Sequence, residues 1–142
     1  MTYATQQQMT DRYGAAQLVN LTDRAAVATG TIDATVVARA LSDADAVIDG
    51  YLAGRYSLPL ISAPPLIADL AQCIAYWKLH ISEPDPKTRT DYEQAVKMLK
   101  DIATGTIRIP AAGIEPATSG ASGVQVTDRE RPFTAENMTG FI

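Results

Sequence analysis

Apolar side chains recur at helical spacing over three long stretches of the chain. The first stretch begins after Asp33 and runs to about Gly54, and its helical face is formed by Val37, Leu41, Ala44, Ile48, Tyr51 and Arg55. Spacings of four and three residues place these side chains on one face of an amphipathic helix. Asp33 is a favourable N-cap, and Gly54 is expected to serve as the C-cap.

The second and third stretches complete a set of three long helices. Pro65 suits the first turn of the second helix. Apolar residues surround most of this helix: Leu66, Ile67, Leu70, Cys73, Ile74, Trp77 and Ile81. A helix of this kind is usually central, so we expect it to form the core. The third helix covers residues 87–104, has one apolar face and is expected to end at Gly105.

Two shorter helical segments are predicted near the N-terminus. Thr5 can cap a helix through "QQQMTDRYG", which Gly14 would end, and "AAQLVNLTD" is compatible with a second short turn. Residues 25–32 are expected to form a loop that leads to the first long helix.

The C-terminal part of the chain differs in composition from the rest. After Ile109, the stretch "PAAGIEPATSGASG" is rich in Pro, Gly and small residues and is typical of a flexible linker. We therefore divide the chain into a helical domain (1–109), a linker (110–122) and an arm (123–142), in which "GVQVTD" is compatible with a short strand. The predicted fold class is all-α: a small bundle of three long helices with short N-terminal helices and an extended C-terminal arm.

Large apolar side chains return in the arm, which carries the only two Phe residues of the chain. The candidates for contact with a partner are Arg131, Pro132, Phe133, Met138, Phe141 and Ile142. Phe, Met and Arg are favoured at protein interfaces, and such a segment can dock apolar anchors into grooves of a partner. The alternatives are that the arm folds back onto its own helices or stays disordered.

Composition narrows the classes of function. The chain has 142 residues and a formal net charge of −4, which fits one globular domain and argues against a protein that wraps nucleic acid. The only cysteine, Cys73, cannot form an intrachain disulfide, so a reducing compartment fits. The N-terminus lacks the pattern of a signal peptide, and no apolar stretch is long enough for a transmembrane helix.

The residues that could carry chemistry do not form a recognisable site. His80 is the only histidine, lies at a helix end and has no nucleophile motif near it, and Cys73 is interpreted as core packing. Counted from Asp43, the acidic stretch "SDADAVIDG" fails the calcium-loop pattern, so its acids are interpreted as a solvated or subunit-facing stripe. The sequence therefore predicts no enzyme, no catalytic residue, no cofactor and no metal ligand.

Several blocks of the sequence resemble one known family. They are "LTDR" (Leu21–Arg24), "ALSDADAVIDGYLAGRYSLPL" (Ala40–Leu60), "PPLIADLAQCIAYWKL" (Pro64–Leu79), "DYEQAVKMLKDIATG" (Asp91–Gly105) and "RPFTAENMTGF" (Arg131–Phe141). Together they resemble small proteins of Mu-like phages and prophages, a family that is similar to the helical head–tail adaptor, or connector, proteins of tailed phages. The family often has an acidic, Gly-containing loop after "LTDR", whereas this chain has "AAVATG", which weakens any ion-binding role for the loop.

The resemblance implies a place in a virion. Copies of a helical bundle would form a ring, typically of twelve, beneath the portal protein, and the ring would extend the DNA channel without binding a specific sequence. It would present a surface to the next neck or tail protein, while the arm would reach the portal or a neighbouring copy. The implied location is the virion neck, with the host cytoplasm before assembly and no membrane partner.

One charged set is a candidate for the contacts between subunits or for the channel lining: Arg39, Asp43, Asp45, Asp49 and Arg55. Ring subunits meet through head-to-tail contacts that close on themselves. Two other hypotheses remain open at this point. The protein could be a tail terminator or tail-completion protein in a ring of different symmetry, or a small helical binding or regulatory module whose arm is a peptide ligand.

Overall fold

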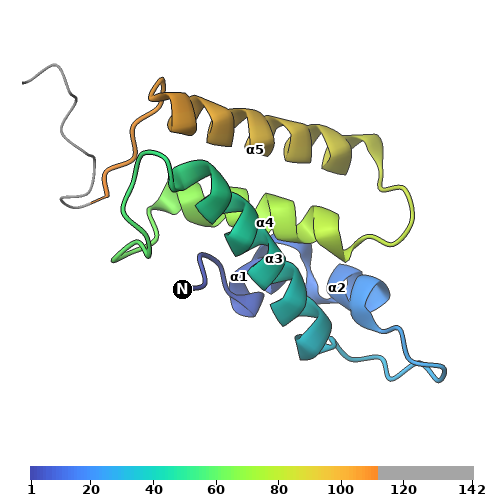
Figure 1. Cartoon of the computed structure of the whole chain (residues 1–142). Coiled ribbons are helices and arrows are strands. Elements are labelled where there is room, and N and C mark those ends of the chain that lie inside the picture. Colours follow the sequence, from blue (N-terminus) through green and yellow to red (C-terminus); the bar gives the residue numbers. More distant parts are fainter. Residues whose placement is uncertain (112–142) are drawn as a thin grey trace, which may run out of the picture.

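Five helices follow one another along the chain, and the three long ones are those that the apolar spacing predicts. The computed structural model describes residues 1–111. The helices are α1 (Gln6–Tyr13), α2 (Ala15–Thr22), α3 (Ala34–Leu52), α4 (Pro65–Leu79) and α5 (Pro86–Thr104) (Figure 1). Residues 1–111 contain no strand, so the all-α fold class is confirmed. The predicted arm, its "GVQVTD" segment and most of the linker lie outside the described residues, and the division into domains stays a prediction.

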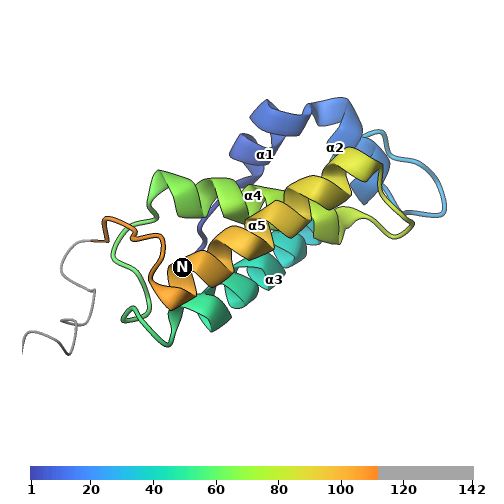
Figure 2. The same cartoon turned by 90° about the horizontal axis from the view of Figure 1, so that it is seen from above.

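Helix α4 is the centre of the bundle, as the sequence predicts. It packs against α3 on one side and α5 on another, and it also contacts α1 (Figures 1 and 2). The residues that it buries come from most of its circumference: Ile67, Leu70, Ala71, Cys73, Ile74, Ala75 and Leu79. The small side chains of Ala71 and Ala75 are fully buried, so neighbouring helices approach the backbone of α4 closely.

Side chains cap the helices at the positions where the sequence places their starts. Thr5 and Gln8 form a reciprocal capping box at α1, and the Asp33 carboxylate accepts two backbone N–H bonds at the start of α3. Helix α5 begins at Pro86, one residue earlier than predicted. Its N-cap is Asp85, which accepts a bond from the backbone N–H of Thr88. Each cap pairs donors that the first turn of a helix leaves without an intrahelical partner.

Two predicted helix ends are wrong. Gly54 is not the C-cap of α3: the cap is Ala53, which keeps right-handed helical angles, and the backbone N–H groups of Arg55 and Tyr56 both bond to the Leu52 carbonyl. Because the chain turns here without a left-handed residue, no glycine is required.

Helix α4 ends at Leu79, so Ile81 lies outside the helix, in contrast to the sequence-based prediction. His80 is extended, and the side chain of Ile81 is 79% exposed. The guanidinium of Arg24 caps this end: its Nη2 donates to the Leu79 carbonyl at 2.7 Å and so pairs an acceptor that the last turn leaves without an intrahelical partner.

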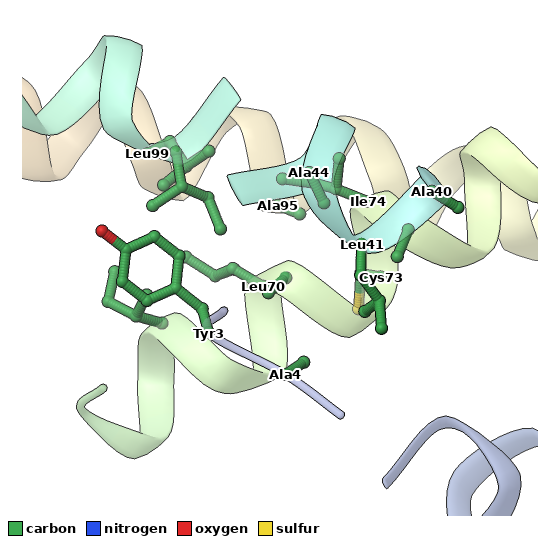
Figure 3. Close-up of a cluster of buried hydrophobic side chains, with 14 of the residues drawn as sticks. Tyr3, Ala4, Ala40, Leu41, Ala44, Leu70, Cys73, Ile74, Ala95 and Leu99 are labelled. Atoms are coloured by element: carbon green, nitrogen blue, oxygen red, sulfur yellow. The ribbon is translucent and has the colours of Figure 1, made fainter. Parts of the chain in front are cut away.

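The N-terminal segment before α1 belongs to the core, which the helical pattern does not predict. Tyr3 is 3% exposed and Ala4 is 1% exposed. Figure 3 shows both residues in one buried cluster with side chains from α3, α4 and α5, among them Leu41, Leu70 and Leu99. The first residues of the chain therefore close the bundle instead of extending from it.

The C-terminal end of α5 is closed by a residue from the connection between α3 and α4. Gly105 adopts the left-handed conformation (φ 85°, ψ 9°), as predicted for a C-cap, and its N–H bonds to the Ile102 carbonyl. The guanidinium of Arg55 lies so close to Gly105 that an added Cβ would overlap Nη1. A cation is favourable at this end of a helix because the last carbonyls carry partial negative charge.

The change Gly105→Ala should lower the free energy of unfolding by at least about 1 kcal/mol, because a side chain is strained at this φ and its Cβ would displace Arg55. Denaturant unfolding followed by circular dichroism measures the effect. Gly50→Ala in α3 is the matched control, since its Cβ would meet no atom and should stabilise the helix by about 0.5–1 kcal/mol. Equal effects of the two changes would contradict this role of Gly105.

Candidate interaction surfaces

The charged set predicted to form one subunit or channel face is divided between two faces of α3. At 3.6 residues per turn, Asp45 and Asp49 lie roughly 120° around the helix from Arg39 and Asp43. Arg39 and Asp43 are exposed. Together with Arg24 and Lys78, they line a hollow of about 70 Å³. This half of the set remains a candidate for contact with another molecule.

The other half of the set, Asp45 and Asp49, bonds to the N-terminal segment of the same chain. Asp45 is 9% exposed, and its Oδ1 accepts the backbone N–H of Tyr3 at 3.1 Å. The hydroxyl of Tyr3 donates to Asp49, one helical turn further on. The interpretation of these acids as a solvated or subunit-facing stripe is therefore wrong for Asp45, because the N-terminal segment covers it.

Burial also affects the ionisation of this pair. Loss of hydration raises the pKa of Asp45 above its ordinary value of 3.8, and the neighbouring Asp49 adds to the rise, while the Tyr3 N–H bond and the N-terminal amino group oppose it. Burial and the bond to Asp49 raise the pKa of the Tyr3 hydroxyl, so it remains a donor at neutral pH. The folded chain thus holds Asp45 less readily as an anion than the unfolded chain does.

The last member of the predicted set, Arg55, is half-buried and lies against Gly105. The residue that follows it has a related role, because the hydroxyl of the buried Tyr56 accepts the backbone N–H of Ile109 at 3.4 Å. These two residues join the α3–α4 connection to the segment that follows α5. Arg55 thus has an intramolecular role that the sequence alone does not show.

The "LTDR" block forms a structural joint between three helices. The hydroxyl of Thr22 donates to the Leu18 carbonyl at 2.7 Å and accepts the backbone N–H of Asp33 at 3.1 Å. Arg24 donates to Leu79 at the end of α4, as described above. The motif thus fixes the end of α2 against the start of α3 and the end of α4.

Within the same block, Asp23 shapes the loop that follows α2. Its carboxylate accepts the backbone N–H groups of Thr29 at 2.7 Å and Gly30 at 2.8 Å. The bond from Gly30 is the largest cause of the lowered pKa of Asp23. This carboxylate therefore pairs backbone N–H groups of the loop that follows α2.

His80 and Cys73 have structural environments. His80 is the C-cap residue of α4, its Nδ1 lies 2.9 Å from the Tyr76 carbonyl oxygen, and its ring meets the Tyr76 ring edge-on at 4.9 Å. Cys73 is buried, and the guanidinium of Arg12 lies 3.4 Å from its sulfur. Burial raises the pKa of the Cys73 thiol, which disfavours the reactive thiolate. Across residues 1–111, no three side chains of the metal-binding types converge.

Aromatic rings gather around the C-terminal half of α4. Tyr76 stacks on Tyr13 of α1 with ring centroids 3.8 Å apart, and Trp77 stacks on Tyr92 of α5 at 4.7 Å. These two pairs attach α1 and α5 to the central helix. Offset-stacked and edge-to-face aromatic pairs add about 0.5–1.5 kcal/mol each to what burial alone supplies.

Next to these rings lies a hollow of about 330 Å³ at the turn between α4 and α5. Its lining residues are Trp77, His80, Ile81, Ser82, Glu83, Pro84 and Arg89. Helical periodicity does not predict this surface, because it assigns Ile81 to the helix. The signal that could have found it is the "SEPDP" break directly after an apolar residue.

Comparison with known proteins identifies the family. A family model described as Bacteriophage Mu, Gp36 matches residues 3–128 of the chain. The chain belongs to this family. The match includes all five helices and confirms the resemblance to proteins of Mu-like phages that the "LTDR" block and the later blocks indicate.

Two relatives illustrate how far the similarity to the Mu Gp36 family extends. Gene product J of Escherichia phage Mu is 34% identical over 146 aligned residues, which cover 100% of both chains. The Mu-like prophage FluMu protein gp36 of Haemophilus influenzae is 29% identical over 112 residues, or 79% of each chain. The first alignment includes Arg131–Ile142, which lies outside the described residues, as do the predicted anchors within it. No helix among residues 1–111 is both long and apolar enough to cross a bilayer.

Substitution of Asp45 tests how the N-terminal segment is held. Asp45→Asn should keep or raise the free energy of unfolding at pH 7, because the amide oxygen can still accept the Tyr3 N–H while the buried charge is removed. Asp45→Ala should lower it by about 1–3 kcal/mol, because that N–H loses its partner. Denaturant unfolding measures both values, and a loss with Asn as large as that with Ala would contradict the assignment.

The pH dependence of stability gives a second test of Asp45. Because its pKa is raised in the folded state, its contribution is fully present below the ordinary value of 3.8 and is lost as pH rises through the raised pKa. The stability advantage of Asp45→Asn over wild type should therefore grow with pH across this interval. Asp43→Asn, at an exposed position on the same helix, is the control and should show no such growth.

Proposed function

We propose that the protein is a structural head–tail adaptor of a Mu-like tailed phage. Copies form a ring below the portal protein, the ring extends the DNA channel, and its far side receives the next neck or tail protein. The observation that carries the proposal is the similarity to a phage Mu gene product over the full length of both chains. The protein would be present in the host cytoplasm before assembly and in the neck of the assembled virion.

The chemistry of the described residues supports a structural role over an enzymatic one. Three polar side chains of residues 1–111 bond to the backbone of the same chain: the buried Thr22 and Asp45 and the exposed Arg24. The one thiol is buried with a raised pKa, and the one imidazole is placed at a helix end. Side chains used in this way hold elements together, which supports a structural role for residues 1–111.

The C-terminal arm supplies the contact with the portal or with a neighbouring copy. The core of residues 1–111 is filled by aliphatic side chains with Tyr and Met, and it contains no Phe. Both Phe residues of the chain, Phe133 and Phe141, fall in the arm instead. Large apolar anchors outside a filled core are most useful when they enter a groove on another molecule.

The charge of the protein suits a channel wall. A net charge of −4 provides no strong attraction for DNA phosphates, so DNA could pass without being retained. Arg39 and Asp43, which stay exposed on α3, are available for contacts between copies or for the channel. A small helical regulator would explain neither this full-length similarity to a phage protein nor the pair of Phe anchors as directly.

Removal of the anchors tests the adaptor function. In a phage that encodes this chain, Phe133→Ala with Phe141→Ala, or deletion of Arg131–Ile142, should weaken assembly of the protein on isolated portal complexes at least about 30-fold. Hot-spot side chains contribute about 2 kcal/mol or more, and a ring on the portal depends on these anchors whether they bind the portal or the neighbouring copy. Electron microscopy should show full heads without tails. Thermal unfolding of the bundle should stay unchanged, because its core is complete without Phe.

The matched control is Val27→Ser, which alters an exposed apolar side chain in the loop between α2 and α3. It should leave portal binding and the yield of tailed particles at the wild-type level. Tailed, infectious particles formed in the complete absence of the protein would overturn the adaptor proposal. A large fall in the unfolding temperature of the double Phe variant would show instead that the arm is part of the chain's own core.

A further inference from the structure

The hollow at the α4–α5 turn has the composition of a docking site. Trp77, Ile81 and Pro84 give it an apolar wall, and His80, Glu83, Ser82 and Arg89 surround it with polar groups. Ile81 is 79% exposed, although Ile is among the residues that are most often buried in a core. Trp and Arg are enriched among the residues that contribute most to binding at interfaces.

The walls of this hollow are held in place before any partner arrives. Trp77 stacks on Tyr92 at 4.7 Å with an interplanar angle of 11°, and His80 is fixed by the carbonyl and the ring of Tyr76. Arg89 forms an ion pair with Glu83 across the turn. A site that is already ordered loses little conformational entropy on binding, so a small ligand segment can bind there usefully.

We propose that this hollow receives the segment Arg131–Ile142 of a neighbouring copy, with a Phe ring of that segment placed against Trp77 and Ile81. A hollow of about 330 Å³ has room for an aromatic side chain, and Trp77, Ile81 and Pro84 provide the apolar contact that a Phe ring requires. This inference rests on the ring arrangement proposed above and names the surfaces that join its copies.

The two surfaces of the proposed contact lie at opposite ends of each copy. Ala111 follows α5 at the end of the bundle opposite the α4–α5 turn (Figures 1 and 2). Helix α5 has 19 residues and is therefore about 28 Å long. The stretch from Ala111 to Phe133 can extend to roughly 70 Å, which is long enough to reach the hollow of its own chain or that of a neighbouring copy. We choose the neighbouring copy because a donor end and a receiving end on opposite sides of each copy create the head-to-tail contact that a closed ring requires.

Fluorescence of Trp77, the only Trp of the chain, reports directly on the hollow. A synthetic peptide with the sequence of residues 131–142 is added to the full-length Phe133→Ala, Phe141→Ala chain, whose own arm lacks the anchors. We expect a saturable shift of emission to shorter wavelength at peptide concentrations up to about 1 mM, the effective concentration that a short tether supplies. A peptide with both Phe replaced by Ala should produce no shift.

Two matched changes in the receiving chain locate the binding site. Ile81→Asp, added to the arm-defective chain, should weaken peptide binding at least about tenfold. Ile61→Asp should not, because Ile61 is equally exposed, at 78%, but lies in the connection between α3 and α4. A peptide that fails to shift the emission, or a shift that survives Ile81→Asp, overturns the proposal.

Sedimentation of the wild-type chain separates docking on a neighbour from docking within one chain. The wild-type chain should form assemblies larger than a monomer, whereas the Phe133→Ala, Phe141→Ala chain and the Ile81→Asp chain should each be monomeric. An equimolar mixture of the two variants should form a 1:1 pair, because the first offers an intact hollow and the second an intact arm. A monomeric wild-type chain, together with normal peptide binding, would show that each arm occupies its own hollow, and the neighbour proposal would be wrong.

These outcomes are independent of the adaptor function. If the peptide does not bind but heads still need the protein to acquire tails, the docking proposal fails and the adaptor function stands. If the peptide binds through Ile81 but heads acquire tails without the protein, the adaptor function fails and the docking proposal stands.

Discussion

The fold depends on covering α4 on most of its sides. Its buried residues extend from Ile67 to Leu79 around nearly the whole helix, so no single neighbour can remove them from water. Helix α3, helix α5 and the N-terminal region each cover a different part. At roughly 25 cal/mol per Å² of apolar surface, this burial is the main favourable term available to a domain of this size.

The two short N-terminal helices, of which α1 also contacts α4, depend on contacts with the rest of the bundle. Helices α1 and α2 have 8 residues each, too short to be stable alone in water. They contribute Met9 and Leu18 to the core and are held by contacts at their ends: the capping box at Thr5, the Thr22 bonds and the stacking of Tyr13 on Tyr76. The buried Asp45 belongs to the same system. Its anion is not favoured by burial, but its oxygen satisfies a backbone N–H that would otherwise be unpaired beside α3.

Local patterns were sufficient to predict the helices but not the contacts between distant parts. Periodicity located the three long helices and the central position of α4, and the capping rules located Thr5, Asp33 and Gly105, because these signals lie within a few residues of the elements that they define. The position of Asp45 could not be deduced in this way. On its own helix it lies outside the apolar stripe, and its bond to the backbone of Tyr3 joins it to a segment 42 residues earlier in the chain. The roles of Arg55 and Arg24 depend on similarly distant partners.

The same limitation explains why the hollow at the α4–α5 turn was not predicted. An apolar residue after Leu79 extends the helical pattern, so periodicity assigns Ile81 to the helix. Arg24, far away in the sequence, takes the Leu79 carbonyl at the point where the helix stops. The turn then projects Ile81 into solvent beside Trp77. The opposite end of the bundle is different, because Arg55 and Gly105 close α5 there and Tyr56 holds the outgoing chain through Ile109. One end of the bundle is thus closed by its own chain, and the other presents a hollow with an apolar wall of Trp77, Ile81 and Pro84. Two unlike ends of this kind suit the proposed head-to-tail association, which joins different surfaces, whereas a two-fold symmetric dimer joins the same surface of both copies.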